Sequence, residues 1–194
     1  MSTADPDGKT ETWLSTTFKG REKIMATAKA ASKVGASIFT TPSDREIVLT
    51  RAFNAPRKLL WEAHTKPEHV SQWMLGPDGW TMPVCEIDLR PGGGWHFVWR
   101  QSDGTEMGMR GVYKEIRPPE KLVSTESWGA DWPDTLNIID LTEEGGTTTM
   151  VTAVVYPSKE AREKALGTGM KDGWSQSYDR LDEYLRTIAR YGKR

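Results

Sequence analysis

Residues 95–116 read WHFVWRQSDGTEMGMRGVYKEI, and this stretch decides the fold class. It contains two strand-like runs, Trp95–Gln101 and Thr105–Ile116, separated by Ser102-Asp103-Gly104. A glycine at this place favours a tight hairpin turn, because glycine adopts positive φ angles without steric cost. The stretch therefore predicts two antiparallel strands that are neighbours in one sheet.

Further strand-like runs lie on both sides of this hairpin, each bounded by turn residues. They are Trp80–Leu89, Lys121–Trp128, Thr135–Thr142 and Thr147–Tyr156. Neighbouring parallel strands need a crossover of about a dozen residues or more, whereas the connections here are short. The runs therefore predict an antiparallel meander.

Helices are predicted both before and after the meander in the sequence. A further strand, Glu46–Phe53, alternates polar and apolar residues and is followed by two short helices that begin near Pro56 and Pro67. The C-terminal segment carries an apolar stripe at helical spacing. Its residues are Leu166, Met170, Trp174, Tyr178, Leu181, Leu185 and Ile188. This order of elements predicts an α+β fold in which a curved antiparallel sheet wraps around one long C-terminal helix.

The composition excludes several classes of protein. The chain of 194 residues has 26 basic and 27 acidic side chains, and this balance argues against nucleic-acid binding. No run of about 18 apolar residues is present, so no membrane span is predicted. Cys85 is the only cysteine, which excludes an internal disulfide and a zinc site built from cysteines. We predict a cytoplasmic protein without a metal or a cofactor.

Residues 1–44 have few large apolar side chains and no clear alternation, and we predict a flexible leader of unknown role there. Residues 45–190 are predicted to form the domain. Met25–Thr41 is basic and rich in small residues, which loosely resembles a transit peptide, and Met25 is a candidate alternative start. Acidic residues earlier in the segment argue against a transit peptide. They are Asp5, Asp7, Glu11 and Glu22.

An ordered succession of short motifs carries a family resemblance. The motifs are Arg51-Ala52-Phe53-Asn54-Ala55-Pro56, Leu60-Trp61, Trp73, Gly76-Pro77, Asp88-Leu89-Arg90-Pro91-Gly92-Gly93, Asp103-Gly104-Thr105, Gly111-Val112-Tyr113-Lys114-Glu115-Ile116, Pro118-Pro119-Glu120-Lys121-Leu122-Val123, Gly169-Met170-Lys171-Asp172-Gly173-Trp174 and Asp179-Arg180-Leu181. Over about residues 45–187 the chain resembles the START-like (SRPBCC) superfamily, which has the helix-grip fold. Within it, the motifs resemble the branch named for the activator of the ninety-kilodalton heat-shock protein's ATPase, of the C-terminal-homology type.

The resemblance implies a cavity between the sheet and the terminal helix, which in relatives takes lipids, polyketides or other hydrophobic molecules. It implies no catalytic residue, because most members of this branch have no assigned substrate and no motif-defined catalytic residues. The eukaryotic co-chaperone of the branch has an additional N-terminal domain, which residues 1–44 are too short and too polar to replace. A chaperone and a second copy of the chain are the candidate protein partners.

The candidate ligand-binding residues are large apolar side chains that the strand and helix periods place toward this cavity. They are Trp73, Trp80, Trp95, Phe97, Trp99, Met107, Met109, Tyr113, Trp128, Met170, Trp174 and Tyr178. Any one of them is better explained by filling the core, but as a set they favour a cavity. Three charged residues in strand runs, Arg110, Glu126 and Asp140, would orient a polar end of the ligand if they point inward. The alternative is that they are ordinary outward-facing residues.

Other residues leave alternatives open. Gly169 and Gly173 either lie within the C-terminal helix, where a close approach of the backbone to the sheet or ligand would offset their low helix propensity, or form a loop before it. His64 and His69 are separated by a proline and lack metal-binding spacing, so surface or satisfied histidines are predicted. Cys85 is interpreted as a small apolar filler of a strand.

Three functions remain after these steps. The first is a non-catalytic START-like protein that binds a small hydrophobic or aromatic ligand. The second is a polyketide cyclase or aromatase, which predicts that Arg110, Glu126, Asp140 or a histidine reaches the cavity with a perturbed pKa. The third is a chaperone-associated adaptor, which predicts an exposed apolar patch on the order of several hundred Å².

Overall fold

In residues 34–191, which the computed structural model describes, eight strands form one antiparallel sheet. Their order is β1-β2-β8-β7-β6-β5-β4-β3, so β3 to β8 form the expected meander and β2 pairs with β8. The strands are β1 (Ile38–Thr40), β2 (Glu46–Phe53), β3 (Trp80–Ile87), β4 (Gly94–Gln101), β5 (Glu106–Arg117), β6 (Lys121–Glu126), β7 (Thr135–Glu144) and β8 (Thr147–Val155). The expected α+β class and the antiparallel meander are confirmed.

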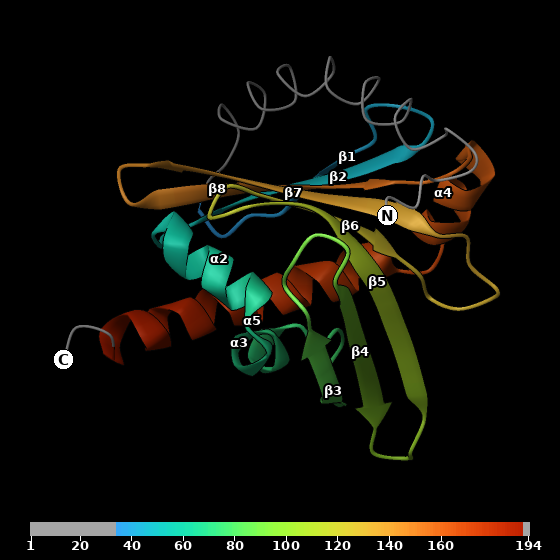
Figure 1. Cartoon of the computed structure of the whole chain (residues 1–194), viewed down its shortest axis with the longest axis horizontal. Coiled ribbons are helices and arrows are strands. Elements are labelled where there is room, and N and C mark those ends of the chain that lie inside the picture. Colours follow the sequence, from blue (N-terminus) through green and yellow to red (C-terminus); the bar gives the residue numbers. More distant parts are fainter. Residues whose placement is uncertain (1–33, 192–194) are drawn as a thin grey trace, which may run out of the picture. The chain divides into compact units, whose positions relative to one another are not determined.

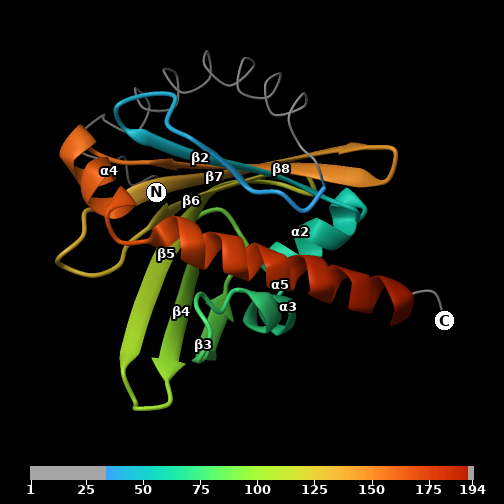
Figure 2. The ribbon, with the colours of Figure 1, turned by 180° about the vertical axis from the view of Figure 1, so that it is seen from behind.

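One long helix lies across one face of this sheet (Figure 1; Figure 2). The helices are α2 (Arg57–Thr65), α3 (Pro67–Trp73), α4 (Lys159–Leu166) and α5 (Met170–Tyr191). Both α2 and α3 pack against α5, and α2 also contacts β7 and β8. We call the face that α5 covers the inner face; Leu49, Leu122 and Met150 belong to it, and the opposite face is the outer face. This arrangement is the helix-grip fold.

The expected single C-terminal helix is divided in two. Ser158 caps α4, because its Oγ accepts a hydrogen bond from the Ala161 N–H at 3.2 Å. Gly169 has a φ of 78°, a left-handed conformation that glycine adopts at low cost, and it separates α4 from α5. Leu166, which the apolar stripe assigned to the terminal helix, therefore ends α4 instead.

The other glycine of this region lies inside α5 and contacts a loop. A Cβ added to Gly173 would be 3.8 Å from Pro77 Cδ, in the loop between α3 and β3. The same loop is bound to α5 twice: the Gly76 N–H donates to Ser177 Oγ at 3.0 Å, and Arg180 Nη1 donates to the Gly76 carbonyl at 2.6 Å. A close approach to a loop, rather than to the sheet, accompanies Gly173 in the helix.

The first strand lies where the sequence predicted none. β1 pairs with β2, with Ile38 opposite Thr50. Just before it, Ser37 Oγ accepts a hydrogen bond from Arg51 Nη1 at 3.1 Å, while Arg51 Nη2 donates to Asp182 Oδ2 of α5 at 2.6 Å. A strand of three residues is too short to show alternation in the sequence. Residues 25–33 of the segment that loosely resembles a transit peptide, the candidate alternative start and most of the predicted flexible leader lie outside the described residues.

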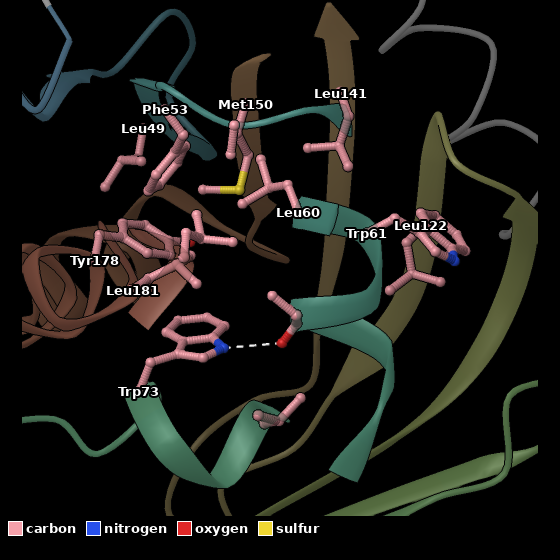
Figure 3. Close-up of a cluster of buried hydrophobic side chains, with 14 of the residues drawn as sticks. Leu49, Phe53, Leu60, Trp61, Trp73, Leu122, Leu141, Met150, Tyr178 and Leu181 are labelled. Carbon is pink, nitrogen blue, oxygen red and sulfur yellow. Dashed lines mark hydrogen bonds between the residues drawn. The ribbon is translucent and has the colours of Figure 1, made fainter. Parts of the chain in front are cut away.

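The core fills the space between α5, α2, α3 and the inner face (Figure 3). Leu60 and Leu181 are fully buried there beside strand residues such as Phe53. Trp73 is also buried, and its Nε1 donates to the Ala63 carbonyl at 2.9 Å, so its polar atom is satisfied (Figure 3). Tyr178, Leu181 and Leu185 of α5 belong to this core, whereas Met170 and Trp174, nearer the N-terminus of the helix, are only partly buried.

Candidate ligand-binding site

An aromatic wall covers the inner face of β4 and β5. Trp95, Phe97 and Trp99 alternate along β4 and are 7%, 5% and 4% exposed. On β5, Met109 lies directly opposite Phe97, and Tyr113 is equally buried. Because successive strand residues point to opposite faces, these side chains all point toward the helices. The predicted sharing of a face along β4 is confirmed.

One residue of this wall leans across a glycine. Trp95 pairs with Gly111 of β5, and a Cβ at Gly111 would lie 2.6 Å from the Trp95 ring and 1.9 Å from the Thr125 carbonyl oxygen of β6. Only glycine therefore fits, and the indole ring lies over β5 in the direction of β6. The Trp95 Nε1 atom is buried and has no hydrogen-bond partner among the described residues.

A second tryptophan extends the wall. Trp128, in the loop after β6, stacks on Trp99 with ring centroids 5.7 Å apart and an interplanar angle of 12°. Trp99 also meets Phe97 edge to face, at 6.2 Å. Its Nε1 donates to the Met74 carbonyl at 2.6 Å, which ties the wall to the end of α3. Stacked and edge-to-face rings of this kind form a stiff apolar surface.

A carboxyl group lies beside this surface. Glu126 ends β6 on the same face as Leu122, and its Oε1 accepts a hydrogen bond from Trp128 Nε1 at 2.6 Å. Its Oε2 accepts a second one from Asn137 Nδ2 of β7. Burial raises the pKa of Glu126 above its ordinary value, and the two donors lower it in part. The residue as a whole is half-buried, and desolvation is the larger of the opposing effects on its carboxyl.

The remaining apolar candidates are divided between the wall and the helix. Tyr178 of α5 is buried, and burial raises its pKa to about 12. Met170 and Trp174 are half-buried in a second apolar cluster, where Trp174 stacks on Phe39 at 6.2 Å. Trp80 is half-buried on the edge strand β3. Met107, the wall residue nearest the hairpin turn, is 37% exposed.

Only one of the three charged candidates is on the inner face. Arg110 is exposed on β5, where its neighbours in sequence, Met109 and Gly111, have the inward position. Asp140 lies opposite Lys121 in the β6–β7 register, and both residues alternate with inward-facing ones. Alternation therefore separates Arg110 and Asp140 from Glu126. Sequence analysis overlooked Asn137, although an amide between the apolar residues of a strand is an unusual choice that points to a partner.

Two other features were expected to lack chemistry. Cys85 faces the wall opposite Phe97, and burial raises the pKa of its thiol to about 11, so it is a neutral apolar contact. Among the described residues, no three His, Cys, Asp or Glu side chains lie close enough together to hold a metal ion.

A groove is found near the outer face of the same strands. It has a volume of about 750 Å³ and is lined by residues of β3 to β6 and the following loop. Glu86, His96 and Arg110 line it, and all three alternate with wall residues of the inner face. Trp95, a residue of the aromatic wall, also lines the groove, together with its strand partner Gly111 and with Ile87 of β3.

With this geometry, comparison with known proteins is informative. The family described as "Activator of Hsp90 ATPase homolog 1-like protein" matches residues 54–186. The chain belongs to this family. The AHSA1-like membership confirms the resemblance that the motifs indicated. No curated protein matches the chain.

Solved structures agree on the fold of this AHSA1-like domain. A crystal structure of a protein from Rhodobacter sphaeroides is 27% identical, covers 79% of this chain and 99% of its own, and has a TM-score of 0.74. A protein from Nitrosomonas europaea is 24% identical over 77% of this chain and 99% of its own, with a TM-score of 0.69. An AHSA1-like protein from Aeromonas hydrophila, 15% identical, covers 73% and 94% with a TM-score of 0.58.

Within residues 34–191, none of the helices is long and apolar enough to cross a membrane. The cytoplasmic location stays a prediction.

Proposed function

We propose that this AHSA1-like domain binds a small, mainly apolar or aromatic ligand between the inner face of the sheet and α5, without catalysing a reaction. The observation that carries the proposal is the carboxyl of the half-buried residue Glu126, which lies beside the stacked rings of Trp99 and Trp128. Ligand sites combine an apolar aromatic lining with a few placed polar groups. A region needed only for stability would have no use for a desolvated carboxyl, which costs free energy.

Incomplete burial of apolar side chains on the inner face supports the proposal. Several of them pack against the core but keep some exposure. They are Trp80, Met82, Ile87, Trp128, Ile139 and Trp174. A bound apolar molecule would bury this surface, and each Å² of apolar surface removed from water would contribute about 25 cal/mol to the free energy of binding.

Tryptophan fluorescence tests the proposal directly. The full chain is titrated with a fatty acid, a flavonoid and an aromatic polyketide, and at least one should give a saturable change. Trp128→Leu should weaken the binding of that ligand, because it removes the ring that stacks on Trp99. Trp132→Leu is the matched control, since Trp132 lies under Lys164 Nζ at 4.2 Å and is not part of the wall. If none of the three compounds gives a saturable change in tryptophan fluorescence, the proposal is refuted.

One observation favours a second candidate, a cyclase or aromatase. Glu126 has a raised pKa and lies in the same site, which suits a group that exchanges protons with a ligand. Against it, Arg110 and Asp140 are on the outer face and supply no partner. Conversion of a linear polyketone to a cyclised product, lost in Glu126→Gln, would replace the binding proposal with this one.

The partners named from the family resemblance stay predictions. A chaperone adaptor requires a continuous apolar patch, whereas the exposed large apolar side chains of the described residues come from three parts of the chain, and the two on β5 alternate to opposite faces of the sheet. They are Val34, Leu89, Met107 and Val112. Co-purification with a chaperone would support the chaperone partner, and a dimer in light scattering would support the second copy of the chain.

A further inference from the structure

Two opposite charges in the lining of the groove near the outer face have no ionic partner. Arg110 of β5 and Asp134, in the loop before β7, are both exposed, and both line this groove of about 750 Å³. Within residues 34–191, neither side chain forms an ion pair or a hydrogen bond, with each other or with another residue. The volume lies within the roughly 300–1,000 Å³ that is typical of small-molecule sites. The groove is therefore large enough for a ligand that would receive these two charges.

The other acidic residues of the lining already have basic partners. Glu86 Oε2 lies 3.6 Å from His96 Nδ1 of the neighbouring strand. Asp88 Oδ2 lies 2.9 Å from Arg90 Nε, just beyond β3. The unpaired arginine and the unpaired aspartate are therefore the two charges of the groove that a ligand can use.

Strand register places three hydrogen-bonding side chains in one row. His96 of β4 lies directly opposite Arg110, and Arg110 forms an isolated bridge with Ser127, just after β6. Opposite residues of an antiparallel pair have side chains on the same face, and neighbouring strands are about 4.8 Å apart. The guanidinium therefore has a hydroxyl on one side and an imidazole on the other, and all three residues line the groove. An arginine can bind both oxygens of a carboxylate, and the hydroxyl can donate a further hydrogen bond.

The surface beside this row is partly apolar. Val112 lies opposite Gly94 in the β4–β5 register and is 37% exposed, and both residues line the groove. Because Gly94 has no side chain to cover the residue opposite it, the valine surface is left for a ligand. An apolar group placed there would remove this surface from water, which is favourable.

These features together select a ligand that carries two charges. A purely anionic molecule would pair with Arg110 and leave Asp134 unpaired in the same groove, and a purely cationic one would do the reverse. We propose that the groove binds a free amino acid with an apolar side chain: its carboxylate pairs with Arg110, its ammonium group pairs with Asp134, and its side chain covers Val112. This binding site is additional to the one proposed between the inner face and α5.

Four small probes test the proposal, each titrated into the full chain by calorimetry at pH 7. They are leucine, leucinamide, which lacks the carboxylate, N-acetylleucine, which lacks the ammonium group, and glycine, which lacks the side chain. We expect leucine to bind about tenfold more tightly than leucinamide or N-acetylleucine, as the loss of a hydrogen bond between charged groups implies. Glycine should also bind more weakly than leucine. The backbone amide resonances of Gly94 and Gly111, which line the groove, should shift with leucine.

Two variants assign the charges of the ligand to their partners. Arg110→Gln should remove the preference for leucine over leucinamide and keep the preference over N-acetylleucine, whereas Asp134→Asn should do the opposite. Arg100→Gln is the control for the first, because Arg100 is paired with Glu106 at 2.6 Å on the same face and does not line the groove. Asp131→Asn, in the same loop but outside the lining, is the control for the second. Both controls should keep the full preference for leucine.

The outcomes distinguish this proposal from the proposed function. If leucinamide or N-acetylleucine binds as tightly as leucine, or if glycine does, the amino-acid proposal is wrong. If leucine does not bind at all, it is also wrong, while the fluorescence titrations still decide on the inner face. If Trp128→Leu abolishes leucine binding and Arg110→Gln does not, leucine binds at the inner face, and the groove is not its site.

Discussion

His64 should make the stability of the domain depend on pH. It lies on α2, is 7% exposed, and packs against the Trp73 ring with centroids 4.8 Å apart. Its Nδ1 is 2.8 Å from the Leu60 carbonyl oxygen and donates to it, while Nε2 is buried without a partner among the described residues. Protonation would place a second N–H and a charge in this apolar position. Burial therefore lowers the pKa of His64 from 6.5 to about 4.

The sign and size of the effect follow from this shift. Between pH 6.5 and 4 the unfolded chain binds a proton at His64 that the folded protein does not bind, so stability falls as the pH is lowered. Each unit of difference corresponds to about 1.36 kcal/mol, which gives a limit of about 3 kcal/mol below pH 4. At pH 5, roughly 2 kcal/mol of the free energy of unfolding should already be lost relative to pH 7.

Urea unfolding at pH 7 and at pH 5 measures this loss. His64→Leu cannot titrate, so the difference in unfolding free energy between wild type and this variant should move by about 2 kcal/mol in favour of the variant at pH 5. All other acidic and basic groups are common to both proteins, so their contributions to the pH dependence cancel in the difference between the two unfolding free energies. His96→Leu, at a residue whose side chain is 45% exposed on the outer face, is the matched control and should follow the wild type. Equal losses in wild type and His64→Leu would refute the reasoning.

Three further predictions concern the packing and charge of the domain. In urea unfolding, Gly111→Ala should destabilise the protein by about 3 kcal/mol or more, because the added Cβ would lie 1.9 Å from a carbonyl oxygen. Gly108→Ala is the control and should change stability little, because the nearest atom to its Cβ would be 4.0 Å away. Arg51→Met should cost about 3–5 kcal/mol in the same assay, because Asp182 would be left buried without its partner; a loss below about 1 kcal/mol would contradict this. Glu126→Gln removes a carboxyl whose pKa burial raises above 4.5, so the wild type should gain stability relative to this variant as the pH falls toward 4.5, and thermal melts that show the reverse would speak against a desolvated carboxyl.

Much of the fold could be predicted from local patterns. Glu46–Phe53 forms a strand with the bounds that alternation indicated, and the runs of the meander end within a few residues of their expected limits. These elements are readable because a strand with one buried face repeats every second residue. β1 was missed because three edge residues carry too little of this period, and α4 was merged with α5 because the break depends on the φ of Gly169.

The candidate site was predicted less completely, for a physical reason. Alternation assigns residues to two faces but does not say which face a helix will cover, so Arg110, Glu126 and Asp140 had equal standing in the sequence. The register of β6 with its neighbours and the position of α5 place Glu126 alone on the inner face. The contact between Trp128 and Glu126 could be suspected from their spacing, whereas Asn137 is brought to the carboxyl only by strand pairing.

By itself, the sequence determined the family, the strands β2 to β8, the short helices α2 and α3 and the aromatic character of β4, because motifs and side-chain periods are local properties. Only the tertiary structure decided that the Trp95 ring lies across Gly111, that its N–H has no partner among the described residues, and that Glu126 accepts hydrogen bonds from Trp128 and Asn137. These relations join β4, β5, β6 and β7, and they arise from register and close packing across the sheet. No pattern along one strand contains that information.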